Sequence, residues 1–243
     1  MSSFFTIWRK ELAGCFLSPV AYVTMVLFLS VSSGTFLIGV TGNEGTTTML
    51  TVILYSSVMT WMTVLITVIC MRLFSEEKSS GTIEPLMTAP VTETAIVLGK
   101  YAGALSFLVI VAMPVIGSVY ILAEMSPGIT FVDRGALVAG GLMVCLICGF
   151  CIAAGLLISL TTRNQIVAAI CCFCFAWLVL LMGWLVSNMP VNAESAAKYL
   201  GADRHLETFC RGIVDTRPVV LYLSGTAFIL FVAVRVLESR RWR

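Results

Sequence analysis

The sequence predicts an all-α integral membrane protein with six transmembrane helices. Hydrophobic residues make up 59% of the 243 residues, only 12% are charged, and the mean hydropathy is +1.00. A soluble domain carries about 25% charged residues. The charges are also clustered, and they leave six charge-free runs that can cross, or nearly cross, a hydrocarbon core needing roughly 20 helical residues. These runs are residues 12–43, 45–71, 101–123, 135–162, 164–193 and 218–234.

The runs are expected to be helices because their apolar residues do not alternate with polar ones. Strands of a membrane barrel alternate over about ten residues, whereas residues 26–40 and 171–186 are apolar on every face. A helix also satisfies its backbone hydrogen bonds within the segment, as a lipid environment requires. The last run is short, but Arg235 can extend its charged group to the interface.

Prolines and charges set the limits of the expected elements. Residues 1–18 predict an interfacial helix, in which Phe5, Trp8 and Leu12 form an apolar stripe with Cys15 or Phe16, and Trp8 is the anchor. Pro19 then starts the first span. The six spans are expected at about 20–40, 48–72, 94–123, 135–160, 165–187 and 217–237, all within one domain that covers residues 1–243.

Between the fifth and sixth spans, the sequence predicts an amphipathic extracytoplasmic segment. Leu206, Phe209, Cys210, Ile213 and Val214 follow helical spacing, so they are expected to share one apolar face. A glycine within this stretch argues against one continuous helix. Whether the segment does more than close the bundle stays open.

The basic residues predict which side of the membrane holds the termini. With six spans both termini share a side, and that side carries ten of the fifteen Lys and Arg residues. They are Arg9, Lys10, Arg72, Lys78, Lys100, Arg163, Arg235, Arg240, Arg241 and Arg243. The positive-inside rule therefore predicts a multi-pass protein of the inner (cytoplasmic) membrane with both termini in the cytoplasm. The net charge of +2 reflects this bias and does not suggest a nucleic-acid partner.

Several enzyme and carrier classes do not fit the sequence. A phosphate-binding loop reads G-x-x-x-x-G-K-[ST], but Tyr101 follows the single Gly-Lys pair and Thr94 stands where the first glycine should be. The one histidine, His205, lies in an outer loop, and no pair of acids falls within a span, which disfavours an intramembrane hydrolase. Ion-coupled carriers normally need ionisable residues in mid-span, and the spans lack them. The chain is therefore expected not to be an enzyme, and its energy source should lie elsewhere.

Nine cysteines raise the question of a metal site. Cys145, Cys148 and Cys151 can face a common point at 100° per residue, and Cys171, Cys172 and Cys174 lie close together in sequence. Their neighbours are Leu, Ile, Phe and Gly, and a metal site needs thiolates with a polar outer shell. We expect these cysteines to pack as small hydrophobes, with soft-metal handling as the alternative, and we expect no bound metal.

A weakly polar stripe runs along the second span. Its members are Ser56, Thr60, Thr63 and Thr67, which recur at helical spacing. Such hydroxyls often bond back to their own helix and mark a packing seam. A surface that lines a substrate path is the alternative, and the sequence does not separate the two.

The longest polar segment of the terminal side lies between the second and third spans. It reads "SEEKSSGTIEPLMTAPVTETAIVLGK" over residues 75–100 and resembles the signature of ABC-2 type transporter permeases. Pro85 is a small departure at a variable position. The N-terminal "RKELAGCFLSPVAY" and the distal "HLETFCRGIVDTRPVVLYL" resemble the gliding-motility-type subgroup, with nitrous-oxide-reductase-maturation permeases as neighbours. The residues that match the signature are Phe74, Glu77, Gly81, Thr82, Glu84, Leu86, Pro90, Val91, Gly99 and Lys100.

The resemblance implies that residues 74–92 form a cytoplasmic coupling helix that docks on a separate ATP-binding-cassette ATPase. The residue types are consistent with a turn followed by a helix, because Gly81 permits a sharp turn, Thr82 can cap a helix and Glu84 is favourable in the first turn of that helix. Leu86 and Met87 would offer a small apolar knob to the partner. A plain connector needs about 2–8 residues, and this segment is much longer.

The resemblance also implies a function. In that family, each permease pairs with a second permease chain, and ATP and Mg²⁺ bind the ATPase and not the permease. We therefore expect the permease subunit of an ATP-driven exporter, which forms the translocation path as a homodimer or heterodimer in contact with membrane lipid. The alternative is a membrane scaffold whose ATPase drives motility or metalloenzyme maturation without transport of a free solute.

Overall fold

The computed structural model describes residues 2–42, 47–75, 78, 91–125, 133–162, 164–187 and 201–241. Over these ranges the chain is helical, and no strand occurs in them. The helices, with gaps in the numbering kept, are α1 (Ser2–Leu17), α2 (Pro19–Gly42), α3 (Thr47–Leu73), α6 (Glu93–Met125), α7 (Arg134–Thr161), α8 (Gln165–Ser187), α10 (Ala202–Cys210) and α11 (Thr216–Arg241).

Six of these helices are long and apolar enough to cross a membrane, namely α2, α3, α6, α7, α8 and α11. The predicted all-helical fold with six spans is therefore confirmed. Each observed helix begins and ends within about four residues of the predicted span. The largest difference is at α11, which continues to Arg241, where an ion pair between Arg235 Nη1 and Glu238 Oε2 (2.8 Å) lies on its surface.

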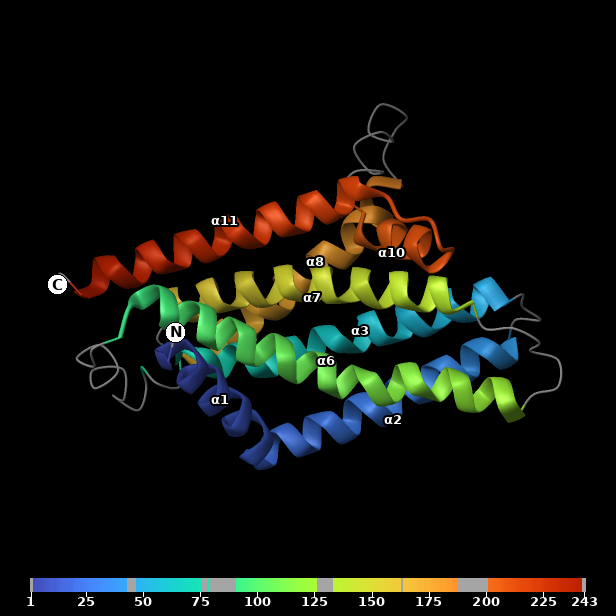
Figure 1. Cartoon of the computed structure of the whole chain (residues 1–243), viewed down its shortest axis with the longest axis horizontal. Coiled ribbons are helices and arrows are strands. Elements are labelled where there is room, and N and C mark those ends of the chain that lie inside the picture. Colours follow the sequence, from blue (N-terminus) through green and yellow to red (C-terminus); the bar gives the residue numbers. More distant parts are fainter. Residues whose placement is uncertain are drawn as a thin grey trace.

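Successive spans alternate in direction, so α1 and the C-terminus of α11 lie at the same end of the bundle (Figure 1). We call this the terminal end; it also holds the last turn of α3 and the first turn of α6. The opposite end holds α10 and the first turns of α7 and α11. This arrangement brings both flanks of the 74–92 segment to the terminal end.

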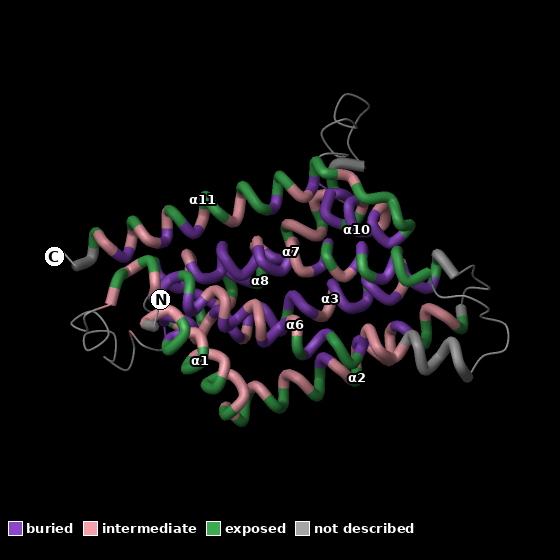
Figure 2. Tube along the Cα trace, in the orientation of Figure 1, coloured by how far each residue is buried: buried purple, intermediate pink, exposed green. Residues whose placement is uncertain are grey.

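The core follows α3 and α7, where the buried residues concentrate (Figure 2). Tyr55 of α3 is fully buried and donates its hydroxyl proton to the carbonyl of Leu137. A Cβ at Gly140 would approach the Tyr55 ring to 2.5 Å, so only glycine lets the two helices meet this closely. By contrast, α2, α8 and α11 expose many large apolar side chains, as lipid-facing or partner-facing helices do.

The predicted amphipathic segment is a shorter helix than its apolar spacing suggested. Leu206, Phe209 and Cys210 of α10 are buried, whereas Ile213 and Val214 are each 60% exposed, so the prediction of one shared apolar face was wrong for these two. The helix ends because Gly212 adopts φ +80°. The amide of Gly212 donates to the Phe209 carbonyl (2.9 Å) and that of Ile213 to Thr208 (3.2 Å), which is a Schellman termination.

Candidate functional site: the terminal junction

The predicted coupling segment begins where α3 ends and finishes where α6 begins. The structure describes Phe74, Ser75, Lys78, Val91 and Thr92 of this stretch. The other predicted coupling residues before α6, namely Glu77, Gly81, Thr82, Glu84, Leu86, Met87 and Pro90, lie outside the described residues. The site is therefore built from the side chains that hold the two flanks, which we call the terminal junction: Glu11, Phe74, Ser75, Lys78, Lys100 and Ser159.

Lys100 is the centre of the terminal junction and is only 1% exposed. Its Nζ donates to Glu11 Oε1 at 2.7 Å and to the Leu73 carbonyl at 2.8 Å, and it lies 4.9 Å from the centroid of the Phe74 ring. A buried ammonium group needs such compensation, because desolvation of an unpaired charge is very costly. One side chain of α6 therefore joins α1 to the C-terminal end of α3.

Helix α1 packs directly on α6 beside this ion pair. A Cβ at Gly99 would lie 2.8 Å from Ile7 Cγ2, so glycine allows the close approach of the two helices. Trp8 Nε1 donates to Ser106 Oγ at 3.1 Å. The predicted stripe is only partly on the packed side, because Phe5 is 59% exposed while Ile7, which the stripe omits, is buried. In the structure, Trp8, which the sequence predicts as an interface anchor, fastens α1 to α6.

Ser159, near the C-terminal end of α7, ties the same flank to α7, which packs along α3. Its Oγ accepts hydrogen bonds from the amides of Phe74 (3.1 Å) and Ser75 (3.0 Å). These amides lie just beyond the last turn of α3, and the structure buries all three residues. A buried backbone donor left without a partner would be costly. Ser159 therefore fixes the direction in which the chain leaves α3.

Lys78 extends this connection to the end of α7. Its Nζ donates to the carbonyls of Ser159 (3.2 Å), Leu160 and Thr162 (3.1 Å). The last carbonyls of a helix lack partners within the helix and carry its negative dipole end, so an ammonium group is favourable there. Lys78 thus caps α7 from within the segment itself.

The predicted coupling residues fall into two groups in the structure. Phe74, Gly99 and Lys100 are buried under α1 and between helices, and Val91 is half-buried. These positions hold the flanks, while the tip of the segment lies outside the described residues. Sequence reasoning did not identify Glu11 or Ser159, because no local pattern distinguishes them from other residues of their helices.

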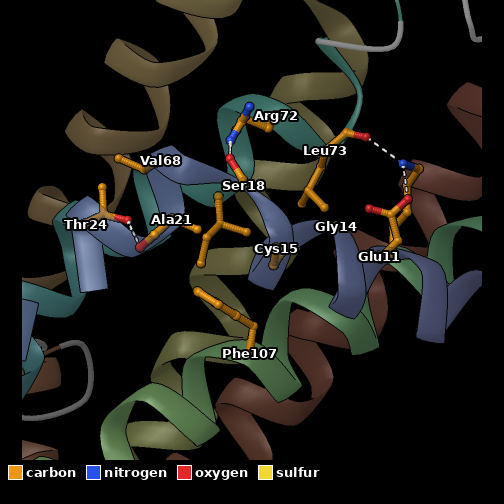
Figure 3. A pocket seen from close by; sticks show the side chains of 12 residues that line it. Glu11, Gly14, Cys15, Ser18, Ala21, Thr24, Val68, Arg72, Leu73 and Phe107 are labelled. Atoms are coloured by element: carbon orange, nitrogen blue, oxygen red, sulfur yellow. Dashed lines mark hydrogen bonds and ion pairs between the residues drawn. The ribbon is translucent and has the colours of Figure 1, made fainter. Parts of the chain in front are cut away.

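A cavity of about 270 Å³ opens beside the terminal junction, between α1, α2, α3 and α6 (Figure 3). Arg72 donates to the Ser18 hydroxyl on one wall, and Phe107 forms part of the apolar wall. Cys15 also lines it, and burial raises the pKa of this thiol to about 11, with a further increase from the Glu11 carboxylate. The thiol is therefore neutral at physiological pH.

The Ser/Thr stripe of the second span is divided between two environments. Ser56 is exposed and Thr60 half-buried, whereas Thr63 and Thr67 are buried within the bundle. Every hydroxyl donates to a carbonyl three or four residues earlier in α3, at 2.7–3.0 Å. The inner pair packs inside this chain, and the outer pair faces its surface.

The predicted packing of the cysteines holds for only some of them: Cys148, Cys151 and Cys172 are buried and Cys145 is half-buried, whereas Cys171 and Cys174 are exposed. The sulfur atoms of Cys70 and Cys172 both lie beside Gly155, where a Cβ would be 2.5 and 3.3 Å from them. Within the described ranges, no group of three or more His, Cys, Asp or Glu side chains is arranged to hold a metal ion. His205 is 8% exposed, and its Nδ1 lies 3.4 Å from the Tyr222 hydroxyl, which joins α10 to α11.

The terminal junction holds together elements from four parts of the chain. Its contacts are one buried ion pair, two backbone amides held by a serine and one lysine cap, and each joins elements that lie far apart in the sequence. The segment that leaves this junction is the one whose residues carry the resemblance to transporter permeases.

Residues 17–180, about two thirds of the chain, match the family described as ABC-2 family transporter protein. The matched range includes four of the six spans, most of the fifth and the whole 74–92 segment. Among curated proteins, none matches the chain. The chain is a multi-pass membrane protein of the ABC-2 transporter family.

Proposed function

We propose that the chain is the permease subunit of an ATP-driven exporter, and that a separate ATP-binding-cassette ATPase docks on residues 74–92. ATP and Mg²⁺ would bind that ATPase, and this chain would hydrolyse nothing itself. The observation that carries the proposal is the anchoring of both flanks of the segment by buried contacts to α1, α6 and α7. A solvent-exposed connector would not need them.

Movement of the docked segment would reach the spans by two routes. Through Leu73 and Lys100 it would pull on α1 and α6, and through Lys78 and Ser159 it would pull on the end of α7. Packed helices with specific polar contacts move as rigid elements between discrete arrangements. The expected result is a tilt of α2, α3 and α8 that opens a path.

The path itself is proposed to form between two permease chains. Large apolar side chains cover the outer surfaces of α2, α8 and α11, and the exposed Ser56 lies on α3. Whether the second chain is identical or related, these surfaces would be divided between the partner and lipid. The cytoplasmic membrane, with both termini in the cytoplasm, is the proposed location because ATP is available there and the basic residues gather at that end.

The alternative proposal is a scaffold that uses the ATPase for motility or metalloenzyme maturation. What supports it is the resemblance of residues 9–22 and of the distal segment from His205 to one permease subgroup. The family match over residues 17–180 does not distinguish that subgroup from other ABC-2 proteins. ATP-dependent accumulation of a solute in reconstituted vesicles would support export. ATP hydrolysis that remains stimulated in vesicles while no solute moves would support the scaffold.

The docking proposal is tested by copurification with the candidate ATPase. Glu84→Lys and Gly81→Pro should each lower the recovered ATPase at least several-fold and abolish its stimulation by the permease. Glu238→Lys is the matched control, because it reverses an exposed charge at the same end of the molecule but on α11. If both segment variants retain the ATPase and its stimulated rate, residues 74–92 are not the docking element.

A further inference from the structure

Helix α1 has one face packed on α6 and another that is exposed. On the packed side, a Cβ at Gly103 would lie 2.8 Å from Glu11 Cβ, and the ring of Phe16 contacts that of Phe107 at 5.0 Å between centroids. The other side of the helix follows four-residue spacing, with one neighbouring lysine. We call it the outward face, and its residues are Phe5, Arg9, Lys10, Ala13 and Leu17, all of them exposed.

The two basic side chains of the outward face have no acidic neighbour on that face. The only acid in residues 2–17 is Glu11, and Lys100 binds it at 2.7 Å on the packed side. Within the part of the chain that the structure describes, neither Arg9 nor Lys10 forms an ion pair or a side-chain hydrogen bond. The exposed Arg235 at the same end, by contrast, is paired with Glu238. The outward face therefore presents two uncompensated positive charges.

The outward face also lies at the boundary of the spans. Only Ser18 separates the end of α1 from the first span, which begins at Pro19. Figure 1 shows that α1 meets α2 at a sharp angle at the terminal end, so α1 does not continue the span. The exposed fractions of Phe5 and Leu17 are 59% and 80%. Because Leu17 is two residues from the span, its apolar side chain lies beside lipid and not in the aqueous phase.

We propose that the outward face of α1 binds the anionic headgroups of the adjacent membrane leaflet. The charges of Arg9 and Lys10 would lie at lipid phosphates, and the side chains of Phe5 and Leu17 would insert among the headgroups. Helices that combine basic residues with exposed apolar ones bind anionic membrane surfaces in this way. Lipid would then hold α1 from outside, while Trp8 and Glu11 hold it on α6.

This contact would link the terminal junction to the charge of the membrane surface. Each basic residue beside an anionic surface strengthens binding about fivefold, so the pair should hold α1 about 25-fold more firmly on anionic than on neutral lipid. Glu11 belongs to the same helix and binds Lys100. The surface charge would therefore set how firmly the α1 side of the junction is held. This effect does not require that an ATPase docks on residues 74–92.

The test is hydrogen–deuterium exchange of the full chain in nanodiscs of phosphatidylglycerol or phosphatidylcholine, with no ATPase present. The amides of residues 2–17 should exchange about 25-fold more slowly in phosphatidylglycerol, and added salt should reduce this ratio. Arg9→Gln and Lys10→Gln should each lower the ratio about fivefold. The double variant should bring it close to one.

Matched variants separate charge from other effects. Arg9→Lys keeps the charge and should retain the ratio, and Arg235→Gln, which removes an exposed arginine of α11, should leave it unchanged. Phe5→Ser should speed the exchange of residues 2–17 by a similar factor in both lipids, because insertion of an apolar ring does not depend on headgroup charge. Unfolding midpoints in an uncharged detergent should match that of the native chain for the two Gln variants of α1.

Three results would overturn the proposal. The first is equal exchange of residues 2–17 in the two lipids for the native chain. The second is a lipid ratio that persists in the double variant of Arg9 and Lys10, which would place the charge effect elsewhere in the molecule. The third is protection of residues 2–17 that arises only when the candidate ATPase is added and is the same in both lipids, which would make the outward face a protein-docking surface.

Discussion

At the scale of single residues, the buried ammonium group of Lys100 dominates the terminal junction. A buried charge is tolerated where an opposite charge and further hydrogen bonds compensate it, and Glu11 with the Leu73 carbonyl supplies both. The exposed pair between Arg235 and Glu238 has a similar length but lies in solvent, so it should contribute little. Two ion pairs at one end of the molecule thus offer a direct comparison.

We expect Glu11→Gln to lower the free energy of unfolding by roughly 1.5–3 kcal/mol, the range for a hydrogen bond to a charged group. Glu238→Gln should change it by less than about 0.5 kcal/mol. Stepwise SDS titration of the purified chain in mixed micelles measures both values. Equal effects of the two substitutions would show that the Lys100 contact is not buried in the membrane-embedded protein.

At the scale of elements, α10 shows how one backbone angle decides which residues face the core. Thr51 Oγ1 of α3 donates to the Cys210 carbonyl at 2.9 Å, so the C-terminal end of α10 is fixed against the bundle. Gly212 then turns the chain at φ +80° and directs Ile213 outward. A helix that continued past this glycine would have carried Ile213 and Val214 along the same face.

Gly212→Ala and Gly34→Ala should therefore have opposite effects. Gly212→Ala places a Cβ on a residue in the left-handed region and should destabilise the chain by about 1–2 kcal/mol. An added Cβ would meet no steric clash there, so the cost comes from the backbone conformation alone. Gly34 lies within α2, and an added Cβ there would have open space around it. Gly34→Ala should therefore raise the free energy of unfolding by up to about 1 kcal/mol. The same SDS titration checks both, and destabilisation by Gly34→Ala would contradict a regular α2 at that position.

At the scale of the whole molecule, the alternation of six spans places both termini and both flanks of the 74–92 segment at one end (Figure 1). An ATPase can bind only one side of the membrane. Both flanks of the 74–92 segment must therefore lie on that side if the segment is to receive force from the ATPase. The excess of basic residues at the same end predicts that this side is the cytoplasm.

The predicted orientation is measured by thiol labelling in intact cells with a membrane-impermeant maleimide. Ile213→Cys, at an exposed position of the opposite end, should react in intact cells. Ser239→Cys, at an exposed position near the end of α11, should react only after the cells are lysed. Labelling of Ser239→Cys in intact cells, with no labelling of Ile213→Cys, would reverse the orientation.

The sequence by itself determined the number of spans, their limits and the position of the polar segment between α3 and α6. It could do so because hydropathy, prolines and charge clusters are local properties of the sequence. A membrane-spanning segment must be long, apolar and internally hydrogen-bonded, so these local properties mark where each span begins and ends. The family resemblance likewise depended on a contiguous motif. The helix limits were therefore predictable to within about four residues.

The tertiary structure alone decided what surrounds the motif residues. Glu11 and Lys100 are 89 positions apart, and Ser159 lies 84 positions from Ser75, so no periodicity connects them. Gly99 and Lys100 read in sequence as the end of a docking motif, yet they are buried against α1. The partner of a buried charge depends on which helices pack beside it, and these helices come together only when the chain folds. For this reason only the tertiary structure shows that both flanks of the polar segment are held in place.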